Sequence, residues 1–226
     1  VLPRRVRTMW ERGRYIEYLF AFTFYRQVQD FYNRPLIASG CFAMYRTARL
    51  RELGGWAHTT VAEDLDLTWR LYQSGHGVRF VPEAVSHPIE PPTLEYMSRQ
   101  LRRWSSGFVQ CVALHWRNLL EVPYLRSVVA IAMWDAVLTS LLFLFVLPVL
   151  AILLGNPWLL LGYLVDVPVL MVPLLFGAVP RRELGLALAS LPAFYVLRTV
   201  NAVFFLRAIW SEWIVRRPLH AFEKGH

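Results

Sequence analysis

The chain has 226 residues, 56% of them hydrophobic, and a formal net charge of +8 at pH 7. That hydrophobic share is too high for an ordinary soluble domain and is concentrated after Pro123, so we expect a membrane part. The two cysteines lack a CxxC spacing and the six histidines lack an HxxxH spacing, which supports neither a disulfide framework nor a zinc site. The positive charge suits anionic phosphate ligands, and no nucleic-acid-binding motif accompanies it.

The start of the sequence is basic and lacks a signal peptide. It begins at Val1 rather than Met, and Arg4, Arg5 and Arg7 are not followed by the apolar core of a secretory signal. We therefore expect this sequence to be a piece of a longer protein.

The first predicted element is an amphipathic helix from Tyr15 to Tyr32, which ends before Pro35. Leu36 to Tyr45 is then a short apolar run that suits a buried strand. Ser39-Gly40 interrupt the run. They indicate either a place where the backbone approaches another group closely or a glycine tolerated at a bulge.

Helix and strand alternate through the rest of the first 92 residues. Thr47 to Leu53 predicts a short helix stopped by Gly54-Gly55, and Gly77 to Val81 predicts a second strand ending at Pro82. This alternation predicts an α/β fold for residues 1–92. Only the second half of such a domain would be present, because its phosphate-binding βαβ units should lie upstream.

Three carboxylates, Glu63, Asp64 and Asp66, crowd the start of another predicted helix. Thr60 and Glu63 have the spacing of a capping box, so we expect this helix to begin near Thr60 and to stop at Gly75. The carboxylates could simply stabilise the positive helix end, at about 0.3 to 1 kcal/mol each. The other interpretation is chemical, since a carboxylate can serve as a general base.

Residues 93–122 predict one long amphipathic helix. Its apolar residues recur at steps of three and four, and its arginines lie off that seam. Such a helix just before membrane spans is expected to lie along the bilayer surface. Gln100, Arg103 and Trp104 share one side of it, and Trp104 suits either an interfacial anchor or a ligand contact.

Residues 123–226 predict a transmembrane region with a basic tail. Three apolar segments, about Val128 to Leu154, Trp158 to Val179 and Leu184 to Leu206, are each near the length that crosses a bilayer. Among their polar residues, we expect Asp135, Asp166, Arg198 and Asn201 to face other helices or a polar path.

The order of these motifs resembles the membrane-embedded family 2 glycosyltransferases, which include the synthases of cellulose, hyaluronan, chitin and poly-N-acetylglucosamine. The stretches that carry the resemblance are Ser39-Gly40, Tyr45-Arg46, Leu53-Gly54-Gly55-Trp56, Glu63-Asp64-Leu65-Asp66-Leu67-Thr68-Trp69-Arg70-Leu71, Gly75, Pro82, and Gln100, Arg103, Trp104 and Gly107. With the membrane spans that follow, the resemblance covers nearly the whole chain. These stretches are not specific for one sugar, although poly-N-acetylglucosamine synthases are the most similar.

The resemblance implies an inverting glycosyltransferase that moves a sugar from a nucleotide-sugar donor to a growing polysaccharide or lipid acceptor. It would be a multi-pass protein of the plasma or bacterial inner membrane, in contact with membrane lipids and with its catalytic part cytosolic. Nucleic acid is not an expected partner. The alternative is a non-catalytic membrane scaffold or subunit derived from such an enzyme.

The resemblance also implies roles for single residues. Asp64 would be the general base with Glu63 as its neighbour, and Trp104 would be the platform under the acceptor sugar. The further implied contacts are Gln100 and Arg103 near the diphosphate, and Ser39 and Gly40 at the sugar site.

A divalent cation, Mg or Mn, is expected in the full-length enzyme. In the family an Asp-x-Asp after an earlier strand holds that cation, whereas the acidic pair before Gln-x-x-Arg-Trp is the base. Asp64-Leu65-Asp66 is therefore not the metal motif, and we expect the metal ligands to be absent from this fragment, which alone should be inactive. Ala62 stands where the family often has Thr, a mild departure that leaves the carboxylates in place.

Overall fold

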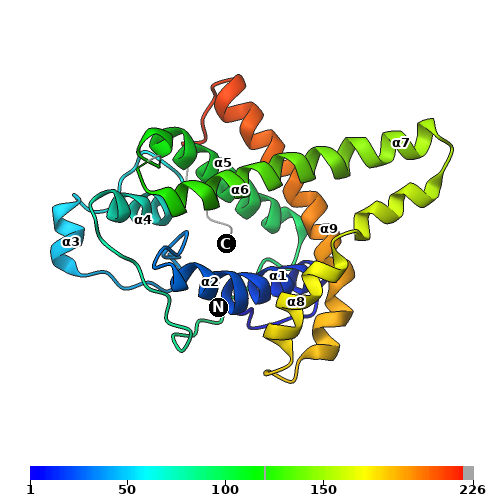
Figure 1. Cartoon of the computed structure of the whole chain (residues 1–226), viewed down its shortest axis with the longest axis horizontal. Coiled ribbons are helices and arrows are strands. Elements are labelled where there is room, and N and C mark those ends of the chain that lie inside the picture. The colour runs from blue at the N-terminus through cyan, green and yellow to red at the C-terminus, as the bar shows by residue number, and fades with distance from the viewer. Residues whose placement is uncertain (120, 221–226) are drawn as a thin grey trace.

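The computed structural model describes residues 1–119 and 121–220, so the end of the predicted tail, residues 221–226, lies outside the described residues. The fold is helical (Figure 1). In chain order the elements are α1 (Met9–Phe20), a π-helical turn (Ala21–Tyr25), α2 (Arg26–Phe31), α3 (Thr47–Glu52), α4 (Glu63–Gln73), α5 (Leu94–Leu119), α6 (Pro123–Leu141), a π-helical turn (Leu142–Val146), α7 (Leu147–Leu153), a 3-10 helix (Pro157–Leu164), α8 (Val167–Ala178), α9 (Leu184–Ile209) and a π-helical turn (Trp210–Ile214).

The predicted α/β fold is wrong, because the described residues contain no strand. The chain from Leu36 to Tyr45 is irregular and has no neighbouring strand to pair with. Its N–H groups bond side chains instead: Leu36 donates to Gln29 (2.9 Å), Ala38 to Thr68 (2.9 Å) and Gly40 to Asp64 (2.7 Å). In the second expected strand, the N–H of Phe80 likewise donates to the Asp30 carboxylate (2.7 Å). The segment from Leu36 to Tyr45 is also half-buried or exposed rather than buried as predicted, and side chains supply partners for its N–H groups without a sheet.

The first helix is continuous from Met9 to Phe31 and begins earlier than predicted. Thr8 Oγ1 accepts a hydrogen bond from the N–H of Glu11 (3.2 Å), and the Glu11 carboxylate accepts one from the N–H of Thr8 (2.9 Å). This reciprocal capping box satisfies N–H groups that have no partner within the helix and fixes its start.

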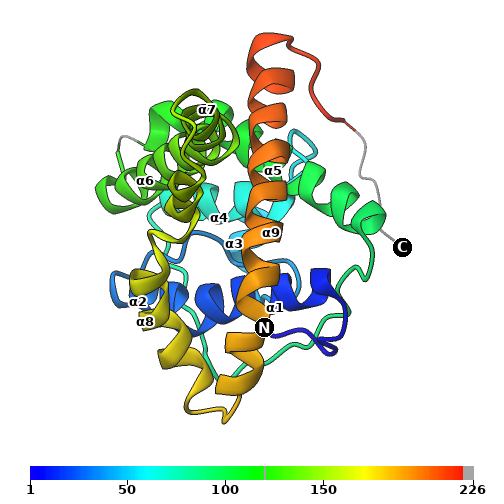
Figure 2. The ribbon, with the colours of Figure 1, turned by 90° about the vertical axis from the view of Figure 1, so that its right-hand side faces the viewer.

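Helix α9 organises the packing. It crosses both α1 and α5, as Figure 2 shows with α9 upright near the centre. One core joins α1, α8 and α9 through Tyr15, Ile16, Leu19, Phe20, Leu174, Ala178, Ala187 and Phe194. A second joins α4, α5 and α6 through Leu65, Trp69, Tyr72, Cys111, Leu125 and Val129. The acidic helix and the long amphipathic helix therefore share one core.

Three helices in the described part are long and apolar enough to cross a membrane: Tyr124–Leu153, Pro157–Ala178 and Leu184–Ile214. They match the three predicted segments, although the third continues further than expected. Large apolar side chains such as Ile152 and Trp134 point outward from them and are exposed. Outward apolar side chains are what a lipid-facing surface needs.

Of the four polar residues predicted to face other helices, Asp166, Arg198 and Asn201 are paired between helices. Asp166 forms an ion pair with Arg198 and accepts a hydrogen bond from Tyr195 Oη (3.0 Å). Asn201 on α9 donates to Glu17 on α1. Asp135 differs, because it is exposed and accepts a hydrogen bond from Thr139 (2.9 Å) on its own helix.

Candidate active site

The Asp64 carboxylate is held against the backbone of Gly40. Asp64 lies in the first turn of α4, where its Oδ2 accepts a hydrogen bond from the N–H of Gly40 (2.7 Å) and its Oδ1 accepts one from the N–H of Leu65 (2.9 Å). A Cβ placed on Gly40 would lie 3.2 Å from Asp64 Oδ2. Of the two interpretations left open by Ser39-Gly40, the structure therefore favours close backbone approach, and the group approached is Asp64.

Helix α4 begins at Glu63, later than the expected start near Thr60. The capping box does not form because the hydroxyl of Thr60 accepts a hydrogen bond from the N–H of Ala62 (3.2 Å), in the turn before the helix. Glu63 and Asp64 consequently occupy the first helical positions, where the positive end of the helix favours carboxylates. The expected stop is confirmed, since the helix ends at Gln73 and Gly75 follows with φ +77°.

Two residues that sequence reasoning missed flank this carboxylate. Burial, together with the negative charges of Asp64 and Glu63, raises the pKa of Tyr45 to about 12, so its hydroxyl is protonated and donates to the carbonyl of Ala38 (3.2 Å). Burial lowers the pKa of Arg26, and the charge of Asp64 is among the groups that oppose this shift. Asp64 therefore has a proton-holding hydroxyl and a guanidinium in its neighbourhood.

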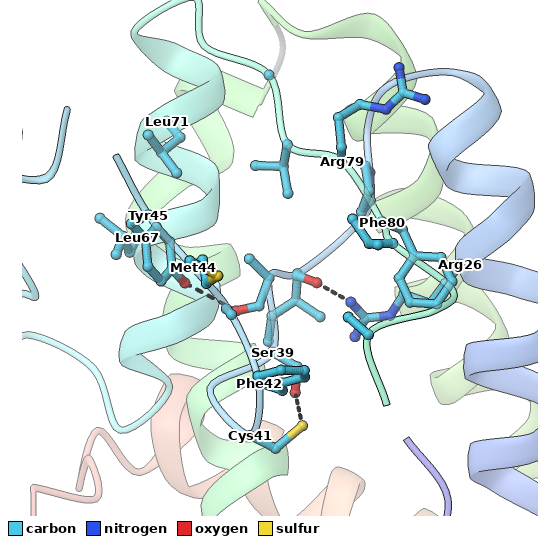
Figure 3. A pocket seen from close by; sticks show the side chains of 18 of the residues that line it. Arg26, Ser39, Cys41, Phe42, Met44, Tyr45, Leu67, Leu71, Arg79 and Phe80 are labelled. Atoms are coloured by element: carbon cyan, nitrogen blue, oxygen red, sulfur yellow. Dashed lines mark hydrogen bonds between the residues drawn. The ribbon is translucent and has the colours of Figure 1, made fainter. Parts of the chain in front are cut away.

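A pocket of about 670 Å³ is lined by Ser39 and Cys41, the chain neighbours of Gly40, but not by Gly40 or Asp64 themselves (Figure 3). Arg26, Tyr45 and Phe80 also line it. Figure 3 shows a hydrogen bond between Ser39 and Cys41 at the lower end of the pocket. The distance between Ser39 Oγ and Cys41 Sγ is 3.3 Å. A volume of this size falls within the range of small-molecule sites, roughly 300 to 1,000 Å³.

Asp66 has a different environment from Asp64, because its side chain is 1% exposed and both of its oxygens are engaged. Oδ2 accepts a hydrogen bond from Arg70 Nε (2.8 Å), and Oδ1 lies 2.7 Å from His115 Nε2 on α5. Burial opposes ionisation, but the hydrogen bond from His115 and the charge of Arg70 outweigh it and lower the pKa of Asp66. Arg70 also donates to the carbonyls of Leu53 and Gly55 (2.8 Å each), which ties the glycine turn after α3 to α4.

The described residues do not fit a metal ion. Within them, no group of three or more His, Cys, Asp and Glu side chains could hold one. Asp66 is saturated by Arg70 and His115, which leaves Asp64 without a second carboxylate ligand from the Asp-x-Asp. No chemical step of this part of the chain is therefore assigned to a bound cation.

On α5 the structure brings Gln100 and Trp104 together around Arg14, a residue of α1. The guanidinium carbon of Arg14 lies 4.7 Å from the centroid of the Trp104 ring. Its Nη2 donates to Gln100 Oε1 (3.2 Å). Arg103, between these two residues in sequence, is half-buried.

Gly107 joins the two motifs. A Cβ placed on it would lie 2.5 Å from the Cβ of Ala62 and 3.0 Å from its backbone nitrogen, so only glycine lets α5 pass the start of α4 at this distance. One turn further on, Gln110 Oε1 accepts a hydrogen bond from the N–H of Val61 (3.0 Å). Trp104 is thus carried on the stretch of α5 that adjoins Glu63 and Asp64.

Comparison with known proteins identifies glycosyltransferases as the proteins to which this chain is similar. A family model described as glycosyl transferase family group 2 matches residues 1–206. An uncharacterised glycosyltransferase of Escherichia coli, YaiP, is 39% identical over 87 residues, which are 38% of this chain and 22% of that protein. A probable glycosyltransferase of Bacillus subtilis, YdaM, is 41% identical over 66 residues, or 29% of this chain and 16% of its own.

A third relative is a poly-beta-1,6-N-acetyl-D-glucosamine synthase of Staphylococcus epidermidis. It is 26% identical over 69 residues, which are 30% of this chain and 17% of that protein. The matched part thus spans less than a quarter of the length of each of these curated relatives. No solved structure matches the chain.

Proposed function

Because the chain belongs to glycosyl transferase family group 2, we propose that it supplies the general base and the acceptor platform of an enzyme that transfers a sugar from a nucleotide-sugar donor to a saccharide acceptor. The observation that carries the proposal is the Asp64 carboxylate, fixed by the N–H of Gly40 and joined through Gly107 to the helix that bears Trp104. This arrangement puts a proton acceptor and an aromatic face on adjoining elements.

The chemistry proposed for Asp64 is removal of one proton. The acceptor hydroxyl gives its proton to the carboxylate while its oxygen forms a bond to the anomeric carbon, and the nucleotide diphosphate leaves with the electrons of the broken bond. A direct displacement of this kind inverts the configuration at the anomeric carbon. The N–H of Gly40 holds one carboxylate oxygen in place, so little reorganisation is needed when the proton moves.

Trp104 is proposed to hold the acceptor ring, since the aromatic face of an indole suits the apolar face of a sugar. Gln100 and Arg103 on the same helix are proposed to contact the diphosphate, for which the planar fork of an arginine is well shaped. The pocket beside Ser39 and Gly40 is proposed to receive the donor sugar. In the family a divalent cation (Mg or Mn) would supply charge stabilisation of the leaving diphosphate, but the residues described here do not form its site.

We also propose a multi-pass position in the plasma or bacterial inner membrane, with α4 and α5 on the cytosolic face. The three apolar helices support this placement. The end of the last one returns to α5, where Gln110 Nε2 donates to the Glu212 carboxylate (3.0 Å). Helix α5 is proposed to lie along the membrane surface and to contact lipids through exposed apolar side chains such as Leu114 and Trp116, because Met97 and Leu101 of its seam are buried against Leu197 of α9.

The test is a transfer assay on the protein made from its complete reading frame, in membranes or detergent. The printed name of the staphylococcal relative makes UDP-N-acetylglucosamine the first donor to try, followed by other UDP-sugars. We expect release of UDP that depends on a short N-acetylglucosamine oligosaccharide, with labelled sugar joined to it. A folded protein that transfers sugar from no donor of the panel would refute the proposal and support a non-catalytic scaffold.

A further inference from the structure

A buried charged cluster, which the proposed chemistry does not use, lies where α1 meets α5. At its centre is Arg14, whose side chain is only 3% exposed. Its guanidinium is paired with Glu17, one turn along α1, and lies 3.4 Å from the carboxylate of Glu90, whose side chain is 2% exposed. Two carboxylates therefore compensate one buried cation.

Apart from the ring of Tyr18 on α1, 5.8 Å away, the other groups that this guanidinium contacts lie on α5. The guanidinium carbon lies over the ring of Trp104, Nη2 donates to Gln100 (3.2 Å), and the same nitrogen lies 2.9 Å from the sulfur of Met97. Arg14 thus touches two of the residues expected to meet the substrate. It does so from the part of α1 that precedes Tyr15, the predicted start of the helix.

The energetics favour a geometric role for this cluster over a stabilising one. Removing a guanidinium and two carboxylates from water is expensive, and well-packed apolar residues often stabilise a fold at least as well as a buried ion pair. The contacts do restrict the orientation of the guanidinium, because its planar fork must hydrogen-bond both Glu17 and Gln100 while it stays within ion-pair distance of Glu90. In that orientation it covers one face of the Trp104 indole.

We propose that Arg14 is a positioning residue that fixes the Trp104 ring for the acceptor sugar. The inference rests on the proposed function, since it assigns to Trp104 the acceptor platform. Arg14 occupies one face of the indole, and the acceptor uses the other face. Arg14 should then act mainly on acceptor binding through Trp104, with a smaller effect on donor binding through its hydrogen bond to Gln100.

The experiment is a double-mutant cycle of Arg14→Gln and Trp104→Ala in the complete protein, assayed with UDP-N-acetylglucosamine and an N-acetylglucosamine tetrasaccharide. Arg14→Gln should raise the acceptor KM about fivefold or more, the loss expected for a desolvated cation–π contact. The donor KM should change much less than the acceptor KM, because Arg14 reaches the donor only through its one hydrogen bond to Gln100, a proposed diphosphate contact. In the Trp104→Ala background, Arg14→Gln should have almost no further effect on acceptor KM.

Two further variants separate position from charge. Arg12→Gln removes the same charge from the same helix at a half-buried position and should leave acceptor KM unchanged. Arg14→Lys keeps a cation near the indole but loses the fork, so it should restore only part of the acceptor affinity. If Arg14→Gln folds poorly because Glu90 is left unpaired, the combined Arg14→Gln and Glu90→Gln variant removes both charges and should show the same acceptor defect.

The outcomes distinguish this inference from the function on which it rests. Active wild-type protein with equal effects of Arg14→Gln in both Trp104 backgrounds would overturn the positioning role alone. So would failure of both Arg14 variants to fold, which would make the cluster purely structural. A folded wild-type protein that transfers no sugar would instead overturn the proposed function, and this inference with it.

Discussion

Replacing Asp64 with asparagine is expected to lower the rate of sugar transfer at least about a hundredfold, within the range of roughly 10² to 10⁴ that general bases contribute. The amide keeps the size of the side chain, and its oxygen can still accept one of the hydrogen bonds from Gly40 and Leu65. It cannot take up the proton of the acceptor. Donor affinity should survive, and the measurement is the transfer rate together with nucleotide-sugar binding in the complete protein.

A purely structural Asp64 predicts the opposite pattern. If the carboxylate only favoured the positive end of α4, neutralising it would lower the free energy of unfolding by about 1 kcal/mol or less. The rate of sugar transfer would then stay near normal. Near-normal transfer by Asp64→Asn, or loss of donor binding as its main defect, would remove Asp64 from the role of base.

The matched substitution two residues away, Asp66→Asn, should destabilise the fold by about 3 kcal/mol, because it leaves Arg70 and His115 without the buried charge they share. Transfer per folded molecule should change by much less than in Asp64→Asn. Denaturant unfolding in detergent measures the loss of stability, and the transfer assay measures the rate per folded molecule. Unchanged stability combined with a large loss of transfer would reverse the two roles.

The depressed pKa of Asp66 gives this prediction a pH dependence. Its folded-state pKa lies below the unfolded value near 3.8, so its contribution to stability is complete above that value and is lost as the pH falls through the folded pKa. Asp66→Asn should therefore lose less stability than the wild type on acidification below about pH 4.

The helices could be predicted from the sequence because their signals are local. Apolar spacing placed α4, α5 and the three membrane-crossing candidates, and glycine placed the ends of α3 and α4. The start of α1 could have been found as well, since Thr8 and Glu11 have capping-box spacing. The same spacing at Thr60 and Glu63 was misleading, because the Thr60 hydroxyl bonds the N–H of Ala62, one residue before the N–H of Glu63 that a capping box needs.

The strands could not be judged from local signals. The apolar run from Leu36 to Tyr45 indicates burial, but whether a buried segment is a strand depends on which groups its N–H donors meet. Those partners are Thr68 and Asp64, far along the chain, and Gln29 on α2. The short apolar run was therefore predicted to be a strand. In the structure, side chains accept the hydrogen bonds that a neighbouring strand would accept in a sheet.

The candidate site, like the fold, could be predicted from the sequence only in part. The motif predicted Asp64, Trp104 and the need for glycine at position 40, but spacing alone could not distinguish Asp64 from Asp66. That distinction depends on His115, which α5 brings to the buried carboxylate. Arg14 was missed because a single arginine in an aromatic helix has no motif, although its spacing to Glu17 offered a weak signal of an ion pair.

The central claim is that one carboxylate, Asp64, acts as a base in a direct displacement. The measurement that tests it most directly is the anomeric configuration of the product formed from an α-linked UDP-sugar, determined by NMR on the transferred residue. A single displacement assisted by Asp64 predicts a β-linked product. An α-linked product would contradict the account. Such a product retains the configuration of the anomeric carbon, whereas a single displacement from the opposite side, with Asp64 as the base, inverts it.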